Sequence, residues 1–257
     1  MINNKKILIL LTILVLVTIL FYSSFKNEEI YILKEYNPSG NLIGTNEYIL
    51  KNGDTIIHGK FVNYDDKGIK ISEGQFINGH INGKCFYYYD NGKIESIQFK
   101  KAKITEETTF FTPEELIEKY VMYDDFGKST FIINFDKKGV TKYKGYPQLE
   151  TYQYKFSHPE QFKIKEQQYL KVGDKLKYSY LIANIPNAKR SFKIENISVD
   201  NSKVKRTLKH IEPCQWDVEE ILTKKGKNTI RSIVKYEFKD KVTPVFIDTL
   251  SFDIEVH

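Results

Sequence analysis

The chain has 257 residues, of which 41% are hydrophobic and 14% aromatic, so it can fill ordinary folded cores and is not a disordered polymer. The formal net charge is +6, but the lysines are spread along the whole chain, which argues against a nucleic-acid-binding patch. Two cysteines, Cys85 and Cys214, are too few for a disulfide framework. Because they fall in different predicted domains, we expect two buried thiols in preference to a bridge between them.

Residues 1–25 form a predicted membrane-directed segment. Two lysines precede an apolar run from Ile7 to Tyr22. Extended to Phe25, the run makes a helix of roughly 28 Å, close to the ~30 Å hydrocarbon core of a bilayer. Bulky aromatics stand where a peptidase prefers small residues, which favours an uncleaved transmembrane anchor over a signal peptide. The lysines before the helix and the acidic pair Glu28 and Glu29 after it predict a cytoplasmic N-terminus and a single-pass protein whose bulk lies outside; cleavage would make it secreted.

Residues 26–104 contain a repeat. Gly59–Gly68 and Gly83–Gly92 lie 24 positions apart and share Gly, Lys, Tyr, Asp and Gly at five places, which indicates a repeat architecture. A shorter theme, an aromatic residue followed four positions later by glycine, predicts a hairpin each time, because Asp and Asn favour turns and glycine supplies the positive φ. Its copies begin at Tyr36, Tyr64, Tyr88, Tyr123 and Phe135.

The spacing of glycines and aromatics in this region resembles MORN repeats, in the variant form of bacterial proteins often labelled antitoxin components. The matching residues, in the order G-x-F-x-x-G-x-x-x-G followed by a tyrosine and a glycine, are Gly74, Phe76, Gly79, Gly83, Tyr88 and Gly92. The resemblance implies a single-layer ribbon of hairpins that contacts proteins or membranes and carries no catalytic residue of its own. About two and a half full units are too few for a solenoid to bury its core, so we expect a cap.

Residues 105–157 are predicted to supply that cap and a connecting hairpin. Thr112-Pro-Glu-Glu115 has the features of a helix start, with an N-cap, a proline and an acidic residue. A short amphipathic helix of about ten residues would follow, with Leu116 and Tyr120 on one face. Capping of the sheet is preferred over docking of a partner. The hairpin from Phe131 to Tyr143 could belong to the repeats or to the next domain.

Residues 158–257 are predicted to form a β-sandwich of about seven strands. The alternation of apolar and polar residues is clear over Leu176 to Tyr180 and over Phe246 to Val256, where only Asp248 interrupts it. The pattern resembles immunoglobulin-like domains of bacterial envelope proteins, although the Cys-Trp-Cys core of antibody domains is missing. For Asp217 to Lys225 a strand is preferred, with a helix as the alternative. The fold class is therefore mainly β, with an N-terminal transmembrane helix, a MORN-like β-hairpin ribbon and an immunoglobulin-like β-sandwich.

The sequence predicts no catalytic residue, metal ligand or cofactor. The five histidines are scattered singly, whereas metal sites need converging ligands. The acidic pairs Asp65-Asp66 and Asp124-Asp125 fall in predicted turns, where backbone hydrogen bonding explains them. An enzyme with a site assembled from turns is the least favoured possibility.

We therefore expect a non-enzymatic, membrane-anchored envelope protein that acts as a protein-binding or scaffolding module. The best candidates for contact with an envelope protein are Lys60, Tyr64, Lys84 and Tyr87. Stacked aromatics more often stabilise the sheet itself, which is the rival interpretation of these positions. The alternative, which comes from the label of the resembled family, is an immunity or antitoxin-like protein that neutralises a partner toxin.

Overall fold

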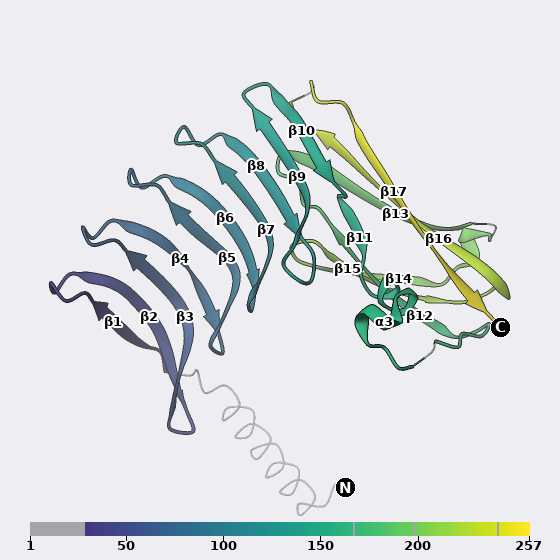
Figure 1. The fold of residues 1–257 in the computed structure, drawn as a ribbon, viewed down its shortest axis with the longest axis horizontal. Coiled ribbons are helices and arrows are strands. Elements are labelled where there is room, and N and C mark those ends of the chain that lie inside the picture. Colours follow the sequence, from purple (N-terminus) through teal and green to yellow (C-terminus); the bar gives the residue numbers. More distant parts are fainter. Residues whose placement is uncertain (1–28, 167, 198, 241) are drawn as a thin grey trace, which may run out of the picture.

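The computed structural model describes residues 29–166, 168–197, 199–240 and 242–257. These residues form one long sheet followed by a sandwich of two smaller sheets, so the prediction of a mainly β protein is confirmed (Figure 1). The predicted transmembrane segment at 1–25 lies outside the described residues. Among the described ones, none of the helices has the length and apolar character needed to cross a bilayer.

The long sheet is an antiparallel meander in which each strand pairs with the next one along the chain. Within the described residues its strands, in order, are β1 (Tyr31–Tyr36), β2 (Leu42–Lys51), β3 (Asp54–Tyr64), β4 (Lys70–Ile77), β5 (His80–Tyr88), β6 (Ile94–Lys101), β7 (Ile104–Phe111), β8 (Ile117–Tyr123), β9 (Ser129–Asp136) and β10 (Gly139–Gly145). Figure 1 shows them side by side in a single curved layer. The sheet thus continues without interruption past residue 104.

The same turn recurs where the odd-numbered strands of this sheet end. In the turn after β3, the Asp65 N–H donates to the Ile69 carbonyl oxygen (2.9 Å), and the Gly68 N–H donates to the Asp65 carbonyl oxygen (3.0 Å). The turns after β1, β5 and β7 have the same two bonds, and a tighter turn joins β9 to β10. The predicted hairpins are therefore confirmed. The copy at Tyr123–Gly127 has the same geometry but joins β8 to β9, and therefore lies at the opposite ends of the strands.

The predicted helix after Thr112 is wrong, because this segment is a further copy of the turn. The Thr112 N–H donates to the Leu116 carbonyl oxygen (2.8 Å), and the chain continues as β8. Glu115 takes the position that glycine holds in the other copies and has a left-handed φ of 67°. Thr112 Oγ1 accepts the Glu114 N–H (3.3 Å), the type of bond that also begins a helix. A helix-start signature and this turn therefore share their chemistry.

Replacing Glu115 by glycine is expected to stabilise the protein by about 0.5–1 kcal/mol, because a left-handed φ costs a side-chain-bearing residue roughly 1–2 kcal/mol. Its ion pair with Lys93, at 3.7 Å between exposed groups, offsets little of this gain. The matched control is Glu114→Gly in the same turn, which removes no left-handed residue and is expected to destabilise. Urea unfolding of both variants measures the difference. A Glu115→Gly variant no more stable than Glu114→Gly contradicts the assignment of the turn.

The second part of the chain is a sandwich of a four-stranded and a three-stranded sheet, in the orders β11-β12-β15-β14 and β13-β16-β17 among the described residues. The elements are β11 (Gln148–Glu150), α2 (Gln153–Ser157), α3 (Pro159–Phe162), β12 (Lys175–Ile182), β13 (Ala188–Ile197), a 3-10 turn (Asn201–Lys203), β14 (Arg206–Ile211), β15 (Gln215–Ile221), β16 (Gly226–Phe238) and β17 (Phe246–Val256). This strand order equals the ABED and CFG sheets of immunoglobulin constant domains.

The sequence pattern of the sandwich is confirmed in detail. Leu176, Tyr178 and Tyr180 are all buried on β12, the segment after Asp217 is a strand and not a helix, and β17 has the predicted bounds. The sandwich begins earlier than residue 158, since β11 already pairs with β12. Asp248, which breaks the alternation on β17, accepts a hydrogen bond from the Gln148 side chain (2.8 Å).

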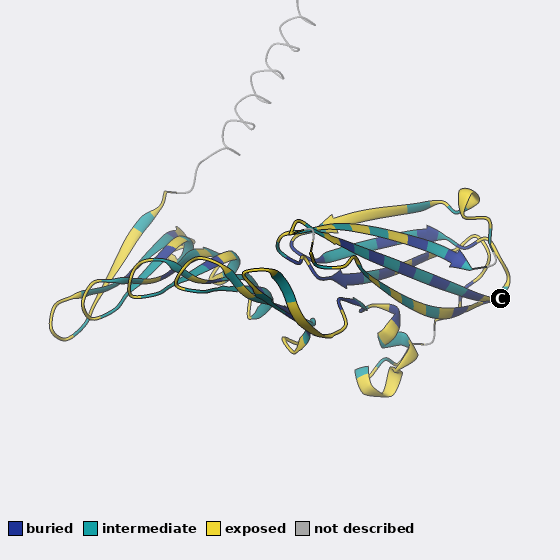
Figure 2. Ribbon diagram, turned by 90° about the horizontal axis from the view of Figure 1, so that it is seen from above, coloured by how far each residue is buried: buried dark blue, intermediate teal, exposed yellow. Residues whose placement is uncertain are grey.

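The sandwich caps the long sheet through a shared core. Tyr120, Met122, Phe131 and Ile133 of β8 and β9 are 0% exposed and belong to the same buried cluster as the sandwich residues. The Phe131 ring stacks on Phe246 of β17 at a centroid distance of 6.1 Å. Figure 2 shows buried residues concentrated in the sandwich and at this end of the sheet. The expected cap therefore exists, but it is a domain, and the hairpin from Phe131 belongs to the sheet.

The two cysteines are confirmed as free and buried. Cys85 lies on β5 beside Gly74 of β4, which pairs directly with Phe61 of β3. A Cβ atom on Gly74 would lie 2.8 Å from Cys85 Sγ and 2.8 Å from Phe61 Cε1. The absence of a side chain at Gly74 thus lets these two larger side chains meet across β4.

Candidate functional site

The four residues predicted for binding do not all share a face of the sheet. Side chains alternate between faces along a strand, so Lys84 and Tyr87, three positions apart on β5, point to opposite sides. Lys60 and Tyr64, four positions apart on β3, share one side. Lys60 and Lys84 are exposed, whereas Tyr64 and Tyr87 are half-buried.

Tyr87 packs within the sheet. Its direct neighbours across the strands are Ser72 and Ser96, which are only 7% and 4% exposed. Lys100 Nζ lies 5.9 Å from the centre of the Tyr87 ring. Because a small serine lies on each side of Tyr87, the tyrosine ring can cover both neighbouring strands. This packing stabilises the sheet and is the alternative to a role of Tyr87 in recognition.

Lys84 belongs to the face that the sandwich covers further along the sheet. Its row of directly paired residues continues through Phe99 and Glu107 to Met122 and Phe131. The last two members are buried in the shared core. One continuous face therefore runs from exposed lysines to the junction with the sandwich.

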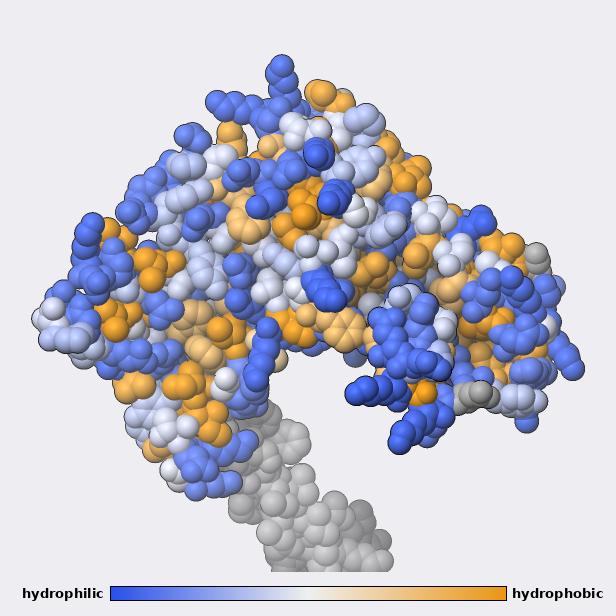
Figure 3. Space-filling view, viewed as in Figure 1, coloured by the Kyte–Doolittle hydropathy of each residue, from blue (hydrophilic) through white to orange (hydrophobic). Residues whose placement is uncertain are grey.

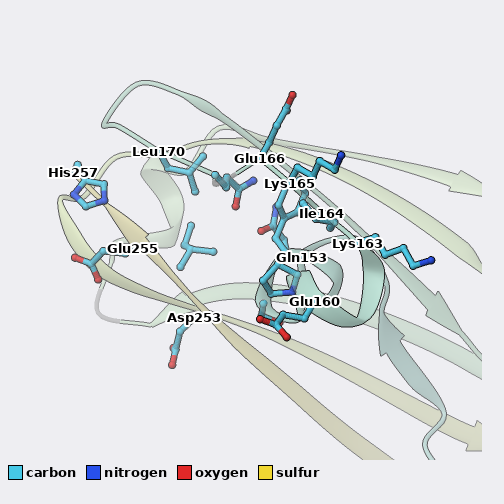
Figure 4. Close-up of a pocket in the computed structure, with 15 residues that line it drawn as sticks. Gln153, Glu160, Lys163, Ile164, Lys165, Glu166, Leu170, Asp253, Glu255 and His257 are labelled. Atoms are coloured by element: carbon cyan, nitrogen blue, oxygen red, sulfur yellow. The ribbon is translucent and has the colours of Figure 1, made fainter.

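A large hollow beside α3 has few converging polar groups. It encloses about 950 Å³ and is lined by Gln153, by the segment after α3 and by the end of β17. Figure 4 shows the charged ends of Lys163, Asp253 and Glu255 pointing in different directions. The His257 ring stacks on Tyr169 at 4.4 Å between centroids. The hollow thus lacks a focus for a ligand.

A second cavity, of about 400 Å³, lies where the long sheet meets the sandwich. We call it the junction cavity. The sheet contributes residues from the end of β6, from β7 and from the turn after β8, and the sandwich contributes residues from β11 to α2, β12 and β15. Its lining comprises Lys101, Ile104, Glu106, Tyr123, Asp124, Asp125, Thr151, Tyr152, Lys155, Ser179, Leu181, Cys214 and Gln215.

The repeat explains how Glu106 reaches the junction cavity. In β3 and β5, Gly59 and Gly83 lie in bulges relative to the preceding strand, with φ of 107° and 87°. In β7 the bulged residue is Glu106, which has no partner opposite it on β6. A bulge re-aims the side chain it carries. Where the earlier units have glycine followed by lysine, this unit has two glutamates in succession, Glu106 and Glu107.

Glu106 is a buried carboxylate with one unused oxygen. Its Oε2 atom is fully buried and accepts no hydrogen bond from any described residue. Its Oε1 atom lies 4.0 Å from Lys101 Nζ, the outer limit of an ion pair. Burial raises the pKa of the Glu106 carboxyl, and the nearby lysine opposes this shift only in part.

Glu107 is buried beside Glu106 and is held by the sandwich. Its Oε2 accepts a hydrogen bond from the Tyr120 hydroxyl (3.0 Å), which in turn accepts the Asn184 N–H (2.8 Å). Burial raises the pKa of Glu107 to about 7, despite the hydrogen bond from Tyr120. Burial also raises the pKa of the Cys214 thiol, so this cysteine remains protonated and unreactive at neutral pH.

The other charged groups of the cavity have partners. Lys155 Nζ pairs with Asp125 Oδ2. Asp124 Oδ1 accepts the N–H groups of Phe126 (2.9 Å) and Lys128 (2.8 Å) in its own turn. Among the described residues, no three His, Cys, Asp or Glu side chains gather as a metal site would require. The incompletely paired carboxylate of Glu106 is therefore the distinctive chemical feature in the lining of the cavity.

Comparisons with known proteins assign no family. No family profile and no curated protein matches the sequence. Solved structures with some likeness include a mutant of S. aureus TarM in complex with fondaparinux, alpha-GlcNAc-glycerol and UDP (14% identity, TM-score 0.24, 51% of this chain and 22% of that one). Domains 4 and 5 of the S-layer protein SbsC share 8% identity (TM-score 0.23, 89% of this chain and 97% of that one), and a longer SbsC structure shares 7% (TM-score 0.24, 91% and 36%). The chain spans about a fifth of the TarM structure, and these TM-scores are too low to relate the folds.

Proposed function

We propose that the protein is a non-enzymatic, membrane-anchored envelope protein that binds a partner protein through its long sheet, with the sandwich as an immunoglobulin-like support. The observation that carries this proposal is the continuous sheet face that runs from the exposed Lys60 and Lys84 to the shared core. Stacked repeats with such a face form extended binding surfaces. The MORN-like spacing of glycines and aromatics supports the same use.

The composition of the surface supports recognition of another protein. Figure 3 shows hydrophilic and hydrophobic side chains intermixed over the visible face of the molecule, as in interfaces between proteins that also exist apart. On the face with the lysines, one row of paired residues runs through Val62, Glu73, Phe86 and Ile97, all half-buried, and Glu73 in this row is paired with Lys70 (3.2 Å). Lys60 and Lys84 stand in equivalent repeat positions beside this row. A partner with acidic residues around an apolar centre would complement it.

Site-specific photo-crosslinking in cells tests the proposal. A photoreactive residue at position 60 or 84 is expected to give one discrete crosslinked protein, whereas the same residue at Lys209, which is exposed on β14 of the sandwich, gives none. Charge reversal of both lysines, Lys60→Glu and Lys84→Glu, is expected to weaken partner binding by roughly tenfold or more, because rim charges set encounter and register. Equal crosslinking at all three positions, or binding unchanged by charge reversal in a folded variant, would refute the proposed face.

A further inference from the structure

We propose that the junction cavity binds a positively charged organic group, an ammonium or guanidinium, through the carboxylate of Glu106. The proposal concerns a site separate from the lysine-bearing face and does not depend on the function proposed above. It rests on three observations: the departure of β7 from the repeat, the incompletely paired carboxylate of Glu106, and the lining of the cavity.

The departure from the repeat places an acid where the architecture needs none. Gly59 and Gly83 fill the bulge of the earlier units without a side chain, and a Cβ on Gly59 would lie 2.2 Å from Glu47 Oε2. In β7 the same position carries the longer side chain of Glu106, in the unit whose bulge lies against the sandwich. Burial of a carboxylate without full hydrogen bonding is unfavourable. An apolar or small residue would stabilise this junction better, which points to a ligand for the acid.

The electrostatics of the cavity favour a cation. Its lining has three carboxylates and two ammonium groups, so the net charge is negative when all are ionised. The pair of Asp125 and Lys155 is mutually satisfied. Lys101 Nζ lies 4.0 Å from Glu106 Oε1, at the outer limit of an ion pair, and the lysine side chain is 52% exposed, so this weak pairing leaves Oε1 able to accept from a second donor. Oε2 is buried without a donor, so it adds to the cost of keeping this carboxylate charged.

The remaining walls suit the stem of an organic cation better than a bare ion. Tyr123, Tyr152, Ile104 and Leu181 supply aromatic and aliphatic surface around the carboxylate. Aromatic rings attract cations, and aliphatic walls pack against the methylene stem of a lysine-like or arginine-like group. A volume of about 400 Å³ falls in the range of small-molecule sites.

Calorimetric titration with N-acetyl-arginine methylamide tests the proposal, with the neutral citrulline analogue as the matched ligand. The arginine compound is expected to bind, and the citrulline compound to bind roughly tenfold or more weakly, because a charge-assisted hydrogen bond is lost. Glu106→Gln is expected to weaken arginine binding by a similar factor. Glu95→Gln, at an exposed glutamate on neighbouring β6, should leave it unchanged.

Two further titrations distinguish a free small-molecule amine from an arginine side chain of a protein as the source of the cation. Binding of free agmatine as tightly as the peptide-like probe supports a small-molecule amine. Tighter binding of the tripeptide Gly-Arg-Gly supports an arginine presented by a protein. Equal affinity for arginine and citrulline probes, or unchanged affinity in Glu106→Gln, would overturn the proposal. So would failure of every cationic probe to bind at about 10 mM, a concentration far above typical small-ligand dissociation constants.

Discussion

Replacing Arg206 by methionine is expected to destabilise the protein by roughly 3–5 kcal/mol, because it leaves the charge of Glu220 buried without its counter-charge. Glu220 is 1% exposed inside the sandwich. Arg206 Nε on β14 donates to Glu220 Oε2 (2.7 Å), and Nη2 lies 2.7 Å from the same oxygen as part of the ion pair. Urea unfolding followed by the fluorescence of Trp216 measures the loss.

The other partners of Glu220 explain why removing one member is so costly. Its Oε2 accepts the Tyr178 hydroxyl (2.7 Å), and its Oε1 accepts the Asn196 side-chain amide (2.8 Å). Arg206 in addition donates to the Ile194 carbonyl oxygen (2.9 Å) and so joins the two sheets of the sandwich. Loss of the guanidinium therefore removes the counter-charge of Glu220 together with the donor to Asn196 Oδ1 and to the Ile194 carbonyl oxygen, and the hydrogen bonds from Tyr178 and Asn196 do not replace that charge.

Two comparisons make this prediction specific. Combining Arg206→Met with Glu220→Gln removes the isolated charge and is expected to recover a large part of the lost stability. Lys175→Met breaks the exposed pair with Glu219 (2.9 Å), which spans β12 and β15 next to the β14–β15 pair of Arg206 and Glu220, and is expected to cost less than about 1 kcal/mol. Equal losses for Arg206→Met and Lys175→Met would contradict a buried, energetically dominant pair.

Replacing Glu107 by glutamine is expected to stabilise the protein at pH 8 by about 3 kcal/mol and to have little effect at pH 4. The carboxyl has an ordinary pKa of 4.5 and a folded-state pKa of about 7. Because the folded-state value is raised, the protonated acid favours folding below about pH 4.5, and this contribution is lost as the pH rises through 7. The difference between the pKa of 4.5 and the folded-state pKa of about 7 corresponds to about 3 kcal/mol of folding free energy.

The measurement is the free energy of unfolding of both chains across pH 4 to 8. The wild-type protein is expected to lose stability over this interval, and Glu107→Gln to lose much less. Burial raises the pKa of Glu106 and Glu150 as well, so part of the slope will remain in the variant. Glu95→Gln, at an exposed position, is the control and should follow the wild type. Parallel curves for wild type and Glu107→Gln would show that Glu107 is not buried as a neutral acid.

The sequence predicted those elements whose signals are local. The alternation along β12 and β17 reflects one face packed in a core, and the aromatic-to-glycine spacing reflects turn chemistry, so both could be recognised without knowledge of the fold. The segment after Thr112 could not, because a threonine that accepts backbone N–H groups begins helices and these turns alike. Only the spacing of about 24 residues from the earlier turns could have revealed it as a copy with Glu115 in place of glycine.

The candidate sites were predicted less well. Lys60 and Lys84 are exposed, as recognition requires, and their contact with a partner stays a prediction. The junction cavity lies between β7 and sandwich residues such as Leu181 and Cys214, which are far along the chain and which no local pattern brings together. The cavity could have been found from one signal in the sequence. When the unit of β7 is aligned with the earlier units, Glu106 and Glu107 stand at the positions of glycine and lysine.

The central claim is that the sheet of repeats and the sandwich form one body through the shared core. Pulsed thiol labelling during urea unfolding tests it, since Cys85 lies in the sheet, Cys214 lies at the junction and Trp216 lies in the sandwich. Peptide mapping assigns the label to each cysteine. We predict that both thiols become reactive over the same urea range in which Trp216 fluorescence changes. Labelling of Cys85 at clearly lower urea, with the Trp216 signal still native, would contradict the claim.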